Sequence, residues 1–289
     1  MAGRYDDRDG KIWMDGALVD WRDANVHVLT HALHYASSVF EGERAYNGKI
    51  FLSREHSERL LTSGRLIDME IPWTVDQIEA AKTQVLKANG FSDAYVRAVA
   101  FRGAGEDMGV ASSRNPVRMA IAAWEWGAYY GDAKMKGAKL DISRWKRPSP
   151  ETIPSAAKAA GLYMICTMSK HAAEAKGCSD AMMFDYRGYV AEATGANIFF
   201  VKDGEVHTPL ADCFLNGLTR QTVIRMLKEK GVAVHERHIL PQELEGFEQC
   251  WLTGTAAEVT PVGQIGDYTF EVGALTRDIA EQYERHVRS

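Results

Sequence analysis

The stretch Thr152-Ile-Pro-Ser-Ala-Ala-Lys158-Ala-Ala-Gly-Leu-Tyr163 places one lysine among residues too small to crowd it. Two interpretations are open. Alanine is the best helix former, so the lysine can be a solvated residue on an Ala-rich helix. Small neighbours can also leave room for a bulky planar group at the lysine amine. The stretch by itself favours the first interpretation, because structural lysines far outnumber reactive ones.

The composition is that of a soluble globular protein with a sizeable core, at 289 residues, 46% hydrophobic and 25% charged. A net charge of −5 gives no electrostatic reason to expect nucleic acid or an anionic membrane as partner. The charged start Met1–Gly10 excludes a conventional secretory signal, and no apolar run is long enough to span a bilayer. The four cysteines form no C-x-x-C pair, which favours a reducing cytoplasm over a disulfide framework.

The first part of the chain predicts strands, then two helices, then strands. Asp15-Gly16 is a hairpin signal between two short apolar runs. Val26–Thr30 predicts a further strand, and Leu33–Phe40 predicts a helix or turn. Helical periodicity covers Arg54–Met69, and Thr74 is an N-cap that opens a second helix.

These elements predict a small α+β domain over residues 1–123. Glycine and polar residues in 124–134 indicate a loop between domains. Residues 135–289 alternate strands and helices and predict a larger domain. Within it, Asp203-Gly204 marks a hairpin and Thr219–Lys230 a capped helix.

Two motifs are weak as sites. His27, His31 and His34 lack the acid and the single-helix spacing of a zinc site, so structural histidines are favoured and no metal is predicted. Gly103–Gly109 has the spacing G-x-G-x-x-x-G and is followed by a helix-breaking segment. This context favours a flexible loop beside a site over a dinucleotide fingerprint.

Three other features indicate anion and ring binding. Gly217-Leu-Thr219 opens a helix whose first N–H groups can bind an anion, although an ordinary capped helix explains it equally well. Thr253–Glu258 is a second turn of small residues. Glu192 ends an apolar strand, where a buried carboxylate needs a cation such as an arginine or a protonated ring nitrogen. With Lys158, this set is what a pyridoxal phosphate site requires.

Several separated motifs agree in order and spacing with those of one known family. They are Tyr35–Tyr46, Ala94–Arg97, Met108–Val110, Lys158, Glu192 and Thr253–Glu258. From about Trp13 to beyond Pro261 the chain resembles the fold type IV pyridoxal phosphate enzymes, and within them the branched-chain amino acid aminotransferases. That family has a small N-terminal α+β domain and a larger C-terminal domain, with the cofactor between them, in a mixed α+β and α/β architecture.

The resemblance implies roles for individual residues. Lys158 would be the catalytic residue and hold pyridoxal 5'-phosphate as a Schiff base, Glu192 would pair with the pyridine nitrogen, and Tyr163 would hydrogen-bond the phenolic oxygen. The remaining cofactor-binding residues would be Arg59, Asn197, Leu218, Thr219 and Thr255. The substrate would be bound by Tyr35, Phe40, Arg44, Tyr95, Arg97, Val110, Tyr129, Thr255 and Ala256, with Tyr35 and Val110 contributed by a second subunit.

The resemblance also implies an activity and partners. The substrates would be leucine, isoleucine or valine with 2-oxoglutarate, and the enzyme would be a cytoplasmic homodimer or a higher homo-oligomer such as a trimer of dimers. Alternatives are a D-amino acid or R-amine transaminase, an aminodeoxychorismate lyase, or a cofactor-free binding protein with a Lys158–Glu192 salt bridge. Two positions depart from common members: Glu43 would alter the pocket rim, and Ala196 would remove an acid that supports the cofactor side.

Overall fold

The computed structural model describes residues 4–126 and 136–289. It consists of two compact units. Unit 1 holds the described residues up to Trp126 together with Ala157–Gly161, and unit 2 holds the other described residues up to Ala156 together with Leu162–Ser289. Tyr129 and most of the predicted loop 124–134 lie outside the described residues. The domain limits drawn from the sequence therefore stay a prediction.

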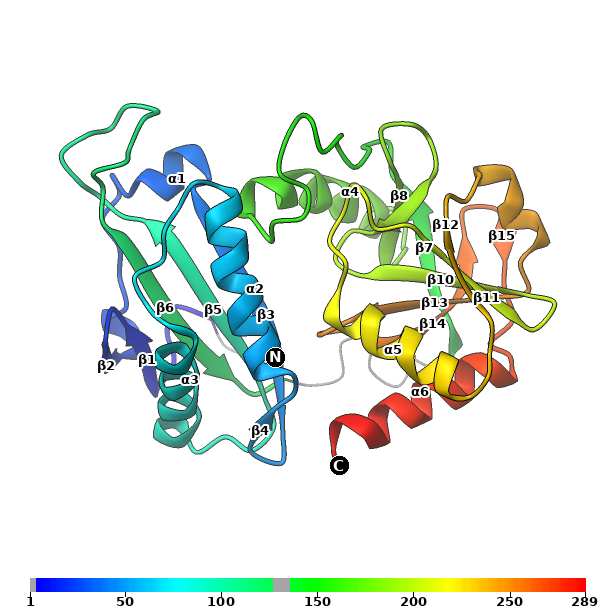
Figure 1. The fold of residues 1–289 in the computed structure, drawn as a ribbon, viewed down its shortest axis with the longest axis horizontal. Helices are drawn as coiled ribbons and strands as arrows, with labels where there is room; N and C mark the ends of the chain where they lie inside the picture. Colours follow the sequence, from blue (N-terminus) through cyan, green and yellow to red (C-terminus); the bar gives the residue numbers. More distant parts are fainter. Residues whose placement is uncertain (1–3, 127–135) are drawn as a thin grey trace. The chain divides into compact units, whose positions relative to one another are not determined.

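Unit 1 is built on a six-stranded antiparallel sheet in the order β2-β1-β6-β5-β3-β4 (Figure 1). Helices α2 and α3 pack on each other, α2 against β3, and α3 against β1 and β6. The elements are β1 Lys11–Met14, β2 Ala17–Asp20, α1 His31–Tyr35, β3 Ser38–Tyr46, β4 Lys49–Ile50, α2 Ser53–Leu66, α3 Val75–Asn89, β5 Ala94–Arg102 and β6 Val117–Trp124.

Local signals account for the ends of several elements. Asp15 has a positive φ of 51° in the turn between β1 and β2, as the predicted hairpin requires. Thr74 accepts a hydrogen bond from the backbone of Gln77 in a capping box at the start of α3. Gly90 ends α3 in the left-handed conformation. The predicted hairpin and the predicted N-cap are confirmed.

The predicted strand at Val26–Thr30 is wrong. The segment is a turn held by local side-chain bonds, because His27 Nδ1 accepts from the N–H of Leu29 and His34 Nε2 lies 3.0 Å from the carbonyl of Val28. Val26 and Val28 are largely exposed, so the apolar alternation here buries no face.

The predicted helix or turn at Leu33–Phe40 is correct only for its first residues. Helix α1 ends at Tyr35 because Ala36 adopts the left-handed conformation at φ 53°. Strand β3 then begins at Ser38 and pairs along its length with β5. Pairing with a neighbouring strand overrides the local pattern.

The Ala-rich helix is the wrong interpretation for the lysine stretch. Lys158 lies in irregular backbone that runs beside β3, where Ala159 forms an antiparallel bridge with Val39. The carbonyl of Lys158 accepts from the N–H of Phe40 at 3.1 Å. Its own N–H donates to Ser63 Oγ at 3.0 Å. The lysine is therefore fixed through its backbone to β3 and α2.

Unit 2 contains a nine-stranded mixed sheet in the order β12-β11-β10-β13-β14-β7-β8-β9, with β15 beside β14. The predicted hairpin at Asp203-Gly204 joins β10 to β11. The elements are β7 Ala138–Ile142, α4 Met164–Glu174, β8 Asp180–Phe184, β9 Val190–Ala193, β10 Asn197–Lys202, β11 Glu205–Pro209, α5 Leu218–Glu229, β12 Val234–Arg237, β13 Gln249–Gly254, β14 Glu258–Ile265, β15 Tyr268–Thr269 and α6 Ala274–Val287.

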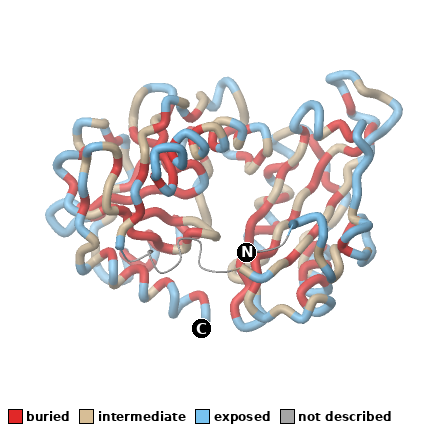
Figure 2. The backbone as a smooth tube through the Cα atoms, turned by 180° about the vertical axis from the view of Figure 1, so that it is seen from behind, coloured by how far each residue is buried: buried red, intermediate tan, exposed pale blue. Residues whose placement is uncertain are grey.

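The unit 2 core follows the strands. Figure 2 shows buried backbone along the strands of each sheet and exposed backbone in the loops. Helix α4 packs on β7 and β8, α5 on β12 and β13, and α6 on β13 and β14. Phe199 and Trp251 stack at 5.5 Å on adjacent strands and are fully buried. The mixed α+β architecture predicted from the sequence is confirmed.

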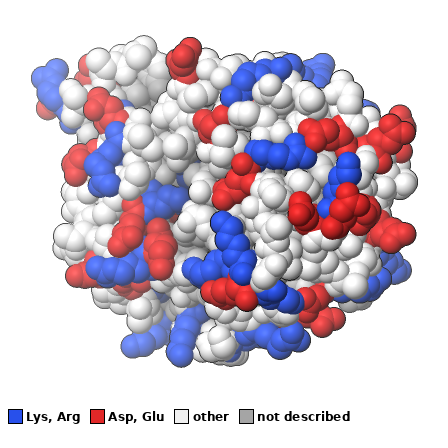
Figure 3. All heavy atoms as spheres, turned by 45° about the vertical axis from the view of Figure 1, so that its right-hand side comes forward, with Lys and Arg blue, Asp and Glu red and all other residues white. Residues whose placement is uncertain are grey.

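The surface carries charges of both signs. Basic and acidic side chains are interspersed over the face shown in Figure 3. In the described part of the chain, none of the helices combines the length and apolar character needed to cross a bilayer.

A buried ion pair between Lys82 and Glu43 connects α3 to β3. The Glu43 side chain is fully buried, and its carboxylate lies 2.7 Å from Lys82 Nζ. Lys82 also donates to Ser57 Oγ at 2.7 Å. Burial raises the pKa of Glu43, and the charge of Lys82 opposes that rise. Glu43 therefore belongs to the core between sheet and helices, and the expected position at a pocket rim is wrong.

We expect Lys82→Met to destabilise the protein by about 3 kcal/mol, because it leaves the buried Glu43 without its cation. The double variant Lys82→Met/Glu43→Leu removes both charges, and we expect it to recover most of that loss. Urea unfolding of the three proteins measures both effects. A double variant no more stable than Lys82→Met would contradict this account of the pair.

Candidate active site

Unit 1 carries an arginine stacked on aromatic rings. The guanidinium carbon of Arg97 lies 4.7 Å from the ring centre of Phe40 and 5.3 Å from that of Tyr95. Arg97 also donates to Tyr95 Oη at 3.0 Å, and its buried Nε has no hydrogen-bond partner among the described residues. A cation held against rings with a donor still available is suited to binding a carboxylate beside apolar surface.

Strand alternation places this cluster on one face of the sheet. Phe40 and Arg44 point to the same side of β3, and the register pairs Arg44 with Tyr95 and Gly42 with Arg97. Position 42 must be glycine, since a Cβ there would collide with the hydroxyl of Tyr95. Arg44 is nearly buried and lies 5.0 Å from the ring of Tyr46. The cluster therefore depends on one glycine in β3.

Lys158 joins the same cluster. Its Nζ lies 4.9 Å from the ring centre of Phe40, in addition to the backbone bonds with Phe40 and Ser63. Ser63 is buried on α2 and follows Arg59 by one helical turn. The lysine amine is thus carried by a segment fixed at both its N–H and its C=O.

Tyr35 and Val110 form a second group in unit 1. Tyr35 Oη donates to the carbonyl of Met108 at 3.0 Å, and the Tyr35 ring stacks on buried His31 at 4.5 Å. His31 in turn lies 3.1 Å from the carbonyl of Gly109 through Nε2. The histidines of the first motif are therefore structural here. Tyr35 and Val110 are 43% and 80% exposed, so both are accessible in the single chain.

Arg59 is held by a carboxylate from the strand beneath it. Glu41 accepts from Arg59 Nε and Nη2, each at 2.7 Å. Glu41 is completely buried, whereas the Arg59 side chain keeps 16% of its surface exposed. The guanidinium thus lies at the edge of the unit 1 core.

In unit 2, Glu192 is a buried carboxylate with an arginine and an amide beside it. Arg147 Nε lies 3.3 Å from Glu192 Oε1, and Asn197 donates to Glu192 Oε2 at 3.0 Å. Burial lowers the pKa of Arg147, but the charge of Glu192, together with smaller contributions from other neighbours, outweighs it and raises that pKa above its ordinary value. An ionised carboxylate is therefore stabilised at this position, as pairing with a protonated ring nitrogen requires.

The N-terminus of α5 is suited to an anion. Its N-cap Gly217 supplies no side-chain cap, and its first turn holds no acidic residue. Leu218 and Thr219 open the helix, with Thr219 buried. The N–H of Gly217 donates to Asn197 Oδ1 at 3.2 Å, so Asn197 connects the helix start to Glu192. As a direct cofactor contact Asn197 stays a prediction, since both its amide hydrogens are donated within the chain.

The turn of small residues joins β13 to β14. Thr255 and Ala256 lie in it half-exposed, and Ala196 packs against Gly254 at its edge. Thr253 Oγ1 is buried and has no hydrogen-bond partner in the described part of the chain. A buried hydroxyl without a hydrogen bond costs free energy, and a bound ligand could supply the missing partner.

These groups fit pyridoxal 5'-phosphate. Glu192 can pair with a ring nitrogen, the start of α5 can bind a phosphate, and Lys158 offers an amine on a fixed segment. Tyr163 lies at the start of α4 and offers a phenolic hydroxyl that can donate a hydrogen bond. The groups of the two units are those of a pyridoxal phosphate-dependent enzyme.

Three neighbours of these residues were not predicted from the sequence. Trp124 and Trp126 lie 5.1 and 4.8 Å from the ring of Tyr95. Their two-residue spacing, which puts both side chains on the same side of an extended chain, was a signal that could have found them. Arg147 carries no such signal, because its partner Glu192 is distant in sequence.

Comparison with known proteins identifies the family. The family model of the amino-transferase class IV matches residues 38–265. A probable branched-chain-amino-acid aminotransferase of Rickettsia felis is 40% identical over 286 residues, 96% of each chain. The branched-chain-amino-acid aminotransferase of Pseudomonas aeruginosa is 42% identical over 264 residues, 90% of this chain and 86% of that one.

Solved structures agree. The branched-chain aminotransferase of Thermoproteus uzoniensis with norvaline superposes with a TM-score of 0.92 at 36% identity, covering 96% of this chain and 94% of that one. The branched-chain amino acid aminotransferase of T.th., complexed with N-(5'-phosphopyridoxyl)-L-glutamate, gives 0.92 at 38%, covering 97% and 95%. The chain belongs to the class IV aminotransferases, which use pyridoxal 5'-phosphate. The resemblance stated from the motifs is confirmed.

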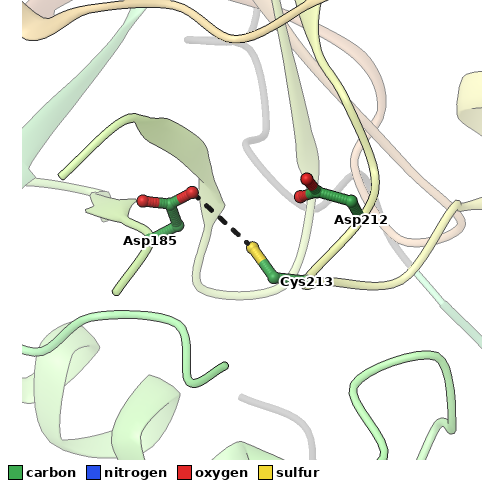
Figure 4. Close-up of side chains that lie close together, drawn as sticks. All are labelled: Asp185, Asp212 and Cys213. Atoms are coloured by element: carbon green, nitrogen blue, oxygen red, sulfur yellow. Dashed lines mark hydrogen bonds between the residues drawn. The ribbon is translucent and has the colours of Figure 1, made fainter. Parts of the chain in front are cut away.

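A group with the composition of a metal site lies elsewhere in unit 2. Figure 4 shows Asp185, Asp212 and Cys213 close together, with the thiol of Cys213 4.0 Å from Asp185. Arg187 already neutralises both carboxylates, at 2.7 Å from Asp185 and 2.8 Å from Asp212. Burial and the two acids raise the pKa of Cys213 to about 12, so the thiolate that a metal prefers is disfavoured. The arginine accounts for this cluster.

We expect the thiols of the native protein to react slowly with a disulfide reagent at pH 7.5. All four cysteines are free and buried, and burial raises the pKa of Cys166 to about 11. Thiolate is the reactive form and is scarce far below the pKa. Titration with and without urea should release four thiols only on unfolding. Rapid labelling of Cys166 or Cys213 in the folded protein would contradict the burial.

Proposed function

We propose that this enzyme is a branched-chain L-amino acid transaminase that moves the amino group of leucine, isoleucine or valine to 2-oxoglutarate. The observation that carries the proposal is Arg97 stacked between Phe40 and Tyr95. A pocket for both substrates must accept an apolar side chain and a side-chain carboxylate in turn. Aromatic walls that hold an arginine supply both surfaces.

Individual residues of the chain have different roles in this reaction. Bound pyridoxal 5'-phosphate supplies an electron sink for the carbanion at the substrate Cα. Lys158 would hold the cofactor through its amine, and the same amine would move the proton at the substrate Cα as base and acid. Glu192 keeps the ring nitrogen protonated, and Arg147 and Asn197 hold the carboxylate in place.

Other residues hold the two ends of the cofactor. The N–H groups of Leu218 and Thr219 at the start of α5, with Arg59 and the turn at Thr255, would bind the phosphate. Tyr163 would donate to the phenolic oxygen. These roles rest on the residue chemistry and on the family.

The same arginine explains how one pocket serves two side chains. With an apolar substrate, Arg97 keeps its hydrogen bond to Tyr95 and its contacts with the rings, so its charge is not left without stabilisation. With glutamate it gains a carboxylate partner. Arg44 and Ala256 would complete the binding of substrate, with Tyr129 as a further proposed contact.

A homodimer or larger homo-oligomer is part of the proposal. Apolar side chains are exposed around α1 of unit 1, and Tyr35 and Val110 lie among them, as expected of residues that complete a neighbouring subunit's pocket. The exposed apolar residues are Val26, Val28, Leu29, Leu33, Tyr35 and Val110. Four free cysteines support a reducing cytoplasm as the compartment.

The competing activities differ in substrate. A D-amino acid transaminase, an R-amine transaminase or an aminodeoxychorismate lyase would use the same lysine. A cofactor-free protein with a Lys158–Glu192 salt bridge is disfavoured, because Glu192 is already neutralised by Arg147. Assays with L-leucine, D-alanine and a primary amine, each with its matching oxo-acid acceptor, decide among the transaminases.

We expect the purified protein to be yellow and to bleach with borohydride, which labels one peptide containing Lys158. Lys158→Arg should abolish both the colour and the label. The control Lys176→Arg, at an exposed lysine paired with Asp141, should change neither. A label on any other lysine would overturn the assignment of Lys158.

We expect Arg97→Ala to lower kcat/KM for glutamate about 100-fold and for leucine less than about threefold, since only glutamate loses a charge-assisted bond. Arg102→Ala is the control, because it removes an arginine from the same strand on the opposite face of the sheet. Equal losses for both substrates would refute the role of Arg97.

A further inference from the structure

A buried carboxylate holds the arginine that is proposed to bind the cofactor phosphate. Glu41 lies on β3, and its two oxygens accept from Nε and Nη2 of Arg59 at 2.7 Å each. His56, one turn before Arg59 on α2, places Nδ1 2.7 Å from Glu41 Oε2. All three side chains belong to unit 1, and Glu41 and His56 are almost completely buried.

The two hydrogen bonds between Arg59 and Glu41 fix the orientation of the guanidinium. Two parallel hydrogen bonds, donated by one edge of a guanidinium to a carboxylate, fix the plane of the guanidinium as well as its position. The bond from His56 holds the carboxylate from another side. Burial raises the pKa of Glu41, but the charge of Arg59 and the hydrogen bonds from Arg59 and His56 outweigh it and hold that pKa well below its usual range. The carboxylate is therefore ionised at neutral pH.

This arrangement has an electrostatic cost for anion binding. An ionised carboxylate on Arg59 reduces the field that a phosphate would feel. What the carboxylate provides in return is orientation, because a long arginine side chain at an edge of the core otherwise loses conformational entropy when it binds. A preformed site benefits from a charged donor whose orientation is already fixed before the ligand binds.

We propose that Glu41 is a positioning residue that acts through Arg59 and determines how tightly the phosphate group of the cofactor is bound. The inference rests on the proposed role of Arg59. It assigns to Glu41 no contact with the cofactor itself.

The chain supplies a matched control two residues further along the strand. Glu43 points to the same helix-covered side of β3 and is equally buried. Its carboxylate pairs with Lys82 on α3, whereas that of Glu41 pairs with Arg59 on α2. Glu41→Gln and Glu43→Gln are thus the same chemical change with different cations affected.

The experiment compares two forms of the cofactor. The full chain, stripped of cofactor, is titrated with pyridoxal 5'-phosphate and with pyridoxal, and binding is followed by absorbance. We expect Glu41→Gln to weaken pyridoxal phosphate about tenfold, the effect of losing one charge-assisted bond, and to leave pyridoxal unchanged. Glu43→Gln should keep the wild-type ratio of the two affinities, even if it lowers the melting temperature.

Further variants separate the possible failures. If Arg59→Ala leaves pyridoxal phosphate binding unchanged, the role of Arg59 itself is wrong. If Arg59→Ala weakens it and Glu41→Gln does not, only the proposal for Glu41 is overturned. Equal weakening of both ligands in Glu41→Gln would show a merely structural role and also overturn it.

A second variant keeps the proposal testable if Glu41→Gln does not fold. His56→Leu leaves the Glu41 carboxylate on Arg59 but removes its other donor. We expect a loss of about threefold for pyridoxal phosphate and none for pyridoxal, as for one weakened hydrogen bond. An unchanged affinity for pyridoxal phosphate, or an equal loss for both ligands, would contradict the proposal.

Discussion

The alternation of side chains along β3 is the constraint on which unit 1 depends. Successive residues of a strand point to opposite faces, so Glu41 and Glu43 face the helices while Phe40 and Arg44 face the other way. A shift of one residue in the pairing with β5 would exchange the two faces, so that Arg44 would face the helices and the two carboxylates would face away from their cations. Gly42 leaves the space into which Tyr95 fits.

The buried carboxylates make that register hard to change. Each would cost several kcal/mol without a cation, and each takes its cation from a different helix. Glu41 binds Arg59 on α2, and Glu43 binds Lys82 on α3. The strand thereby positions both helices. Since Ser63 on α2 also accepts from the N–H of Lys158, the position of this lysine follows from the same register.

The sequence predicts the local elements of this structure, but not which residues pair between distant segments. The hairpin at Asp15 and the capped helix after Thr74 were correct because their signals lie within a few residues of each other. The alternation in Val26–Thr30 predicts a strand wrongly, because alternation does not show whether either face is buried. The Glu43–Lys82 and Arg147–Glu192 pairs could not be predicted, since their members meet only when distant segments pack.

In unit 2, the side chain of Asn197 connects the Glu192 carboxylate to the start of α5. The three bonds of the Asn197 amide join the Glu192 carboxylate, the carbonyl of Leu215 and the N–H of Gly217. One residue thus fixes the separation between the carboxylate proposed to pair with the ring nitrogen and the helix start proposed to bind the phosphate. In unit 1, one turn of α2 carries both Arg59 and Ser63, and Ser63 accepts from the N–H of Lys158. The separation between Arg59 and the backbone of Lys158 is therefore fixed as well. A cofactor with two differently charged ends needs that spacing held rigidly, because a misplacement of about 1 Å is enough to lose much of the rate.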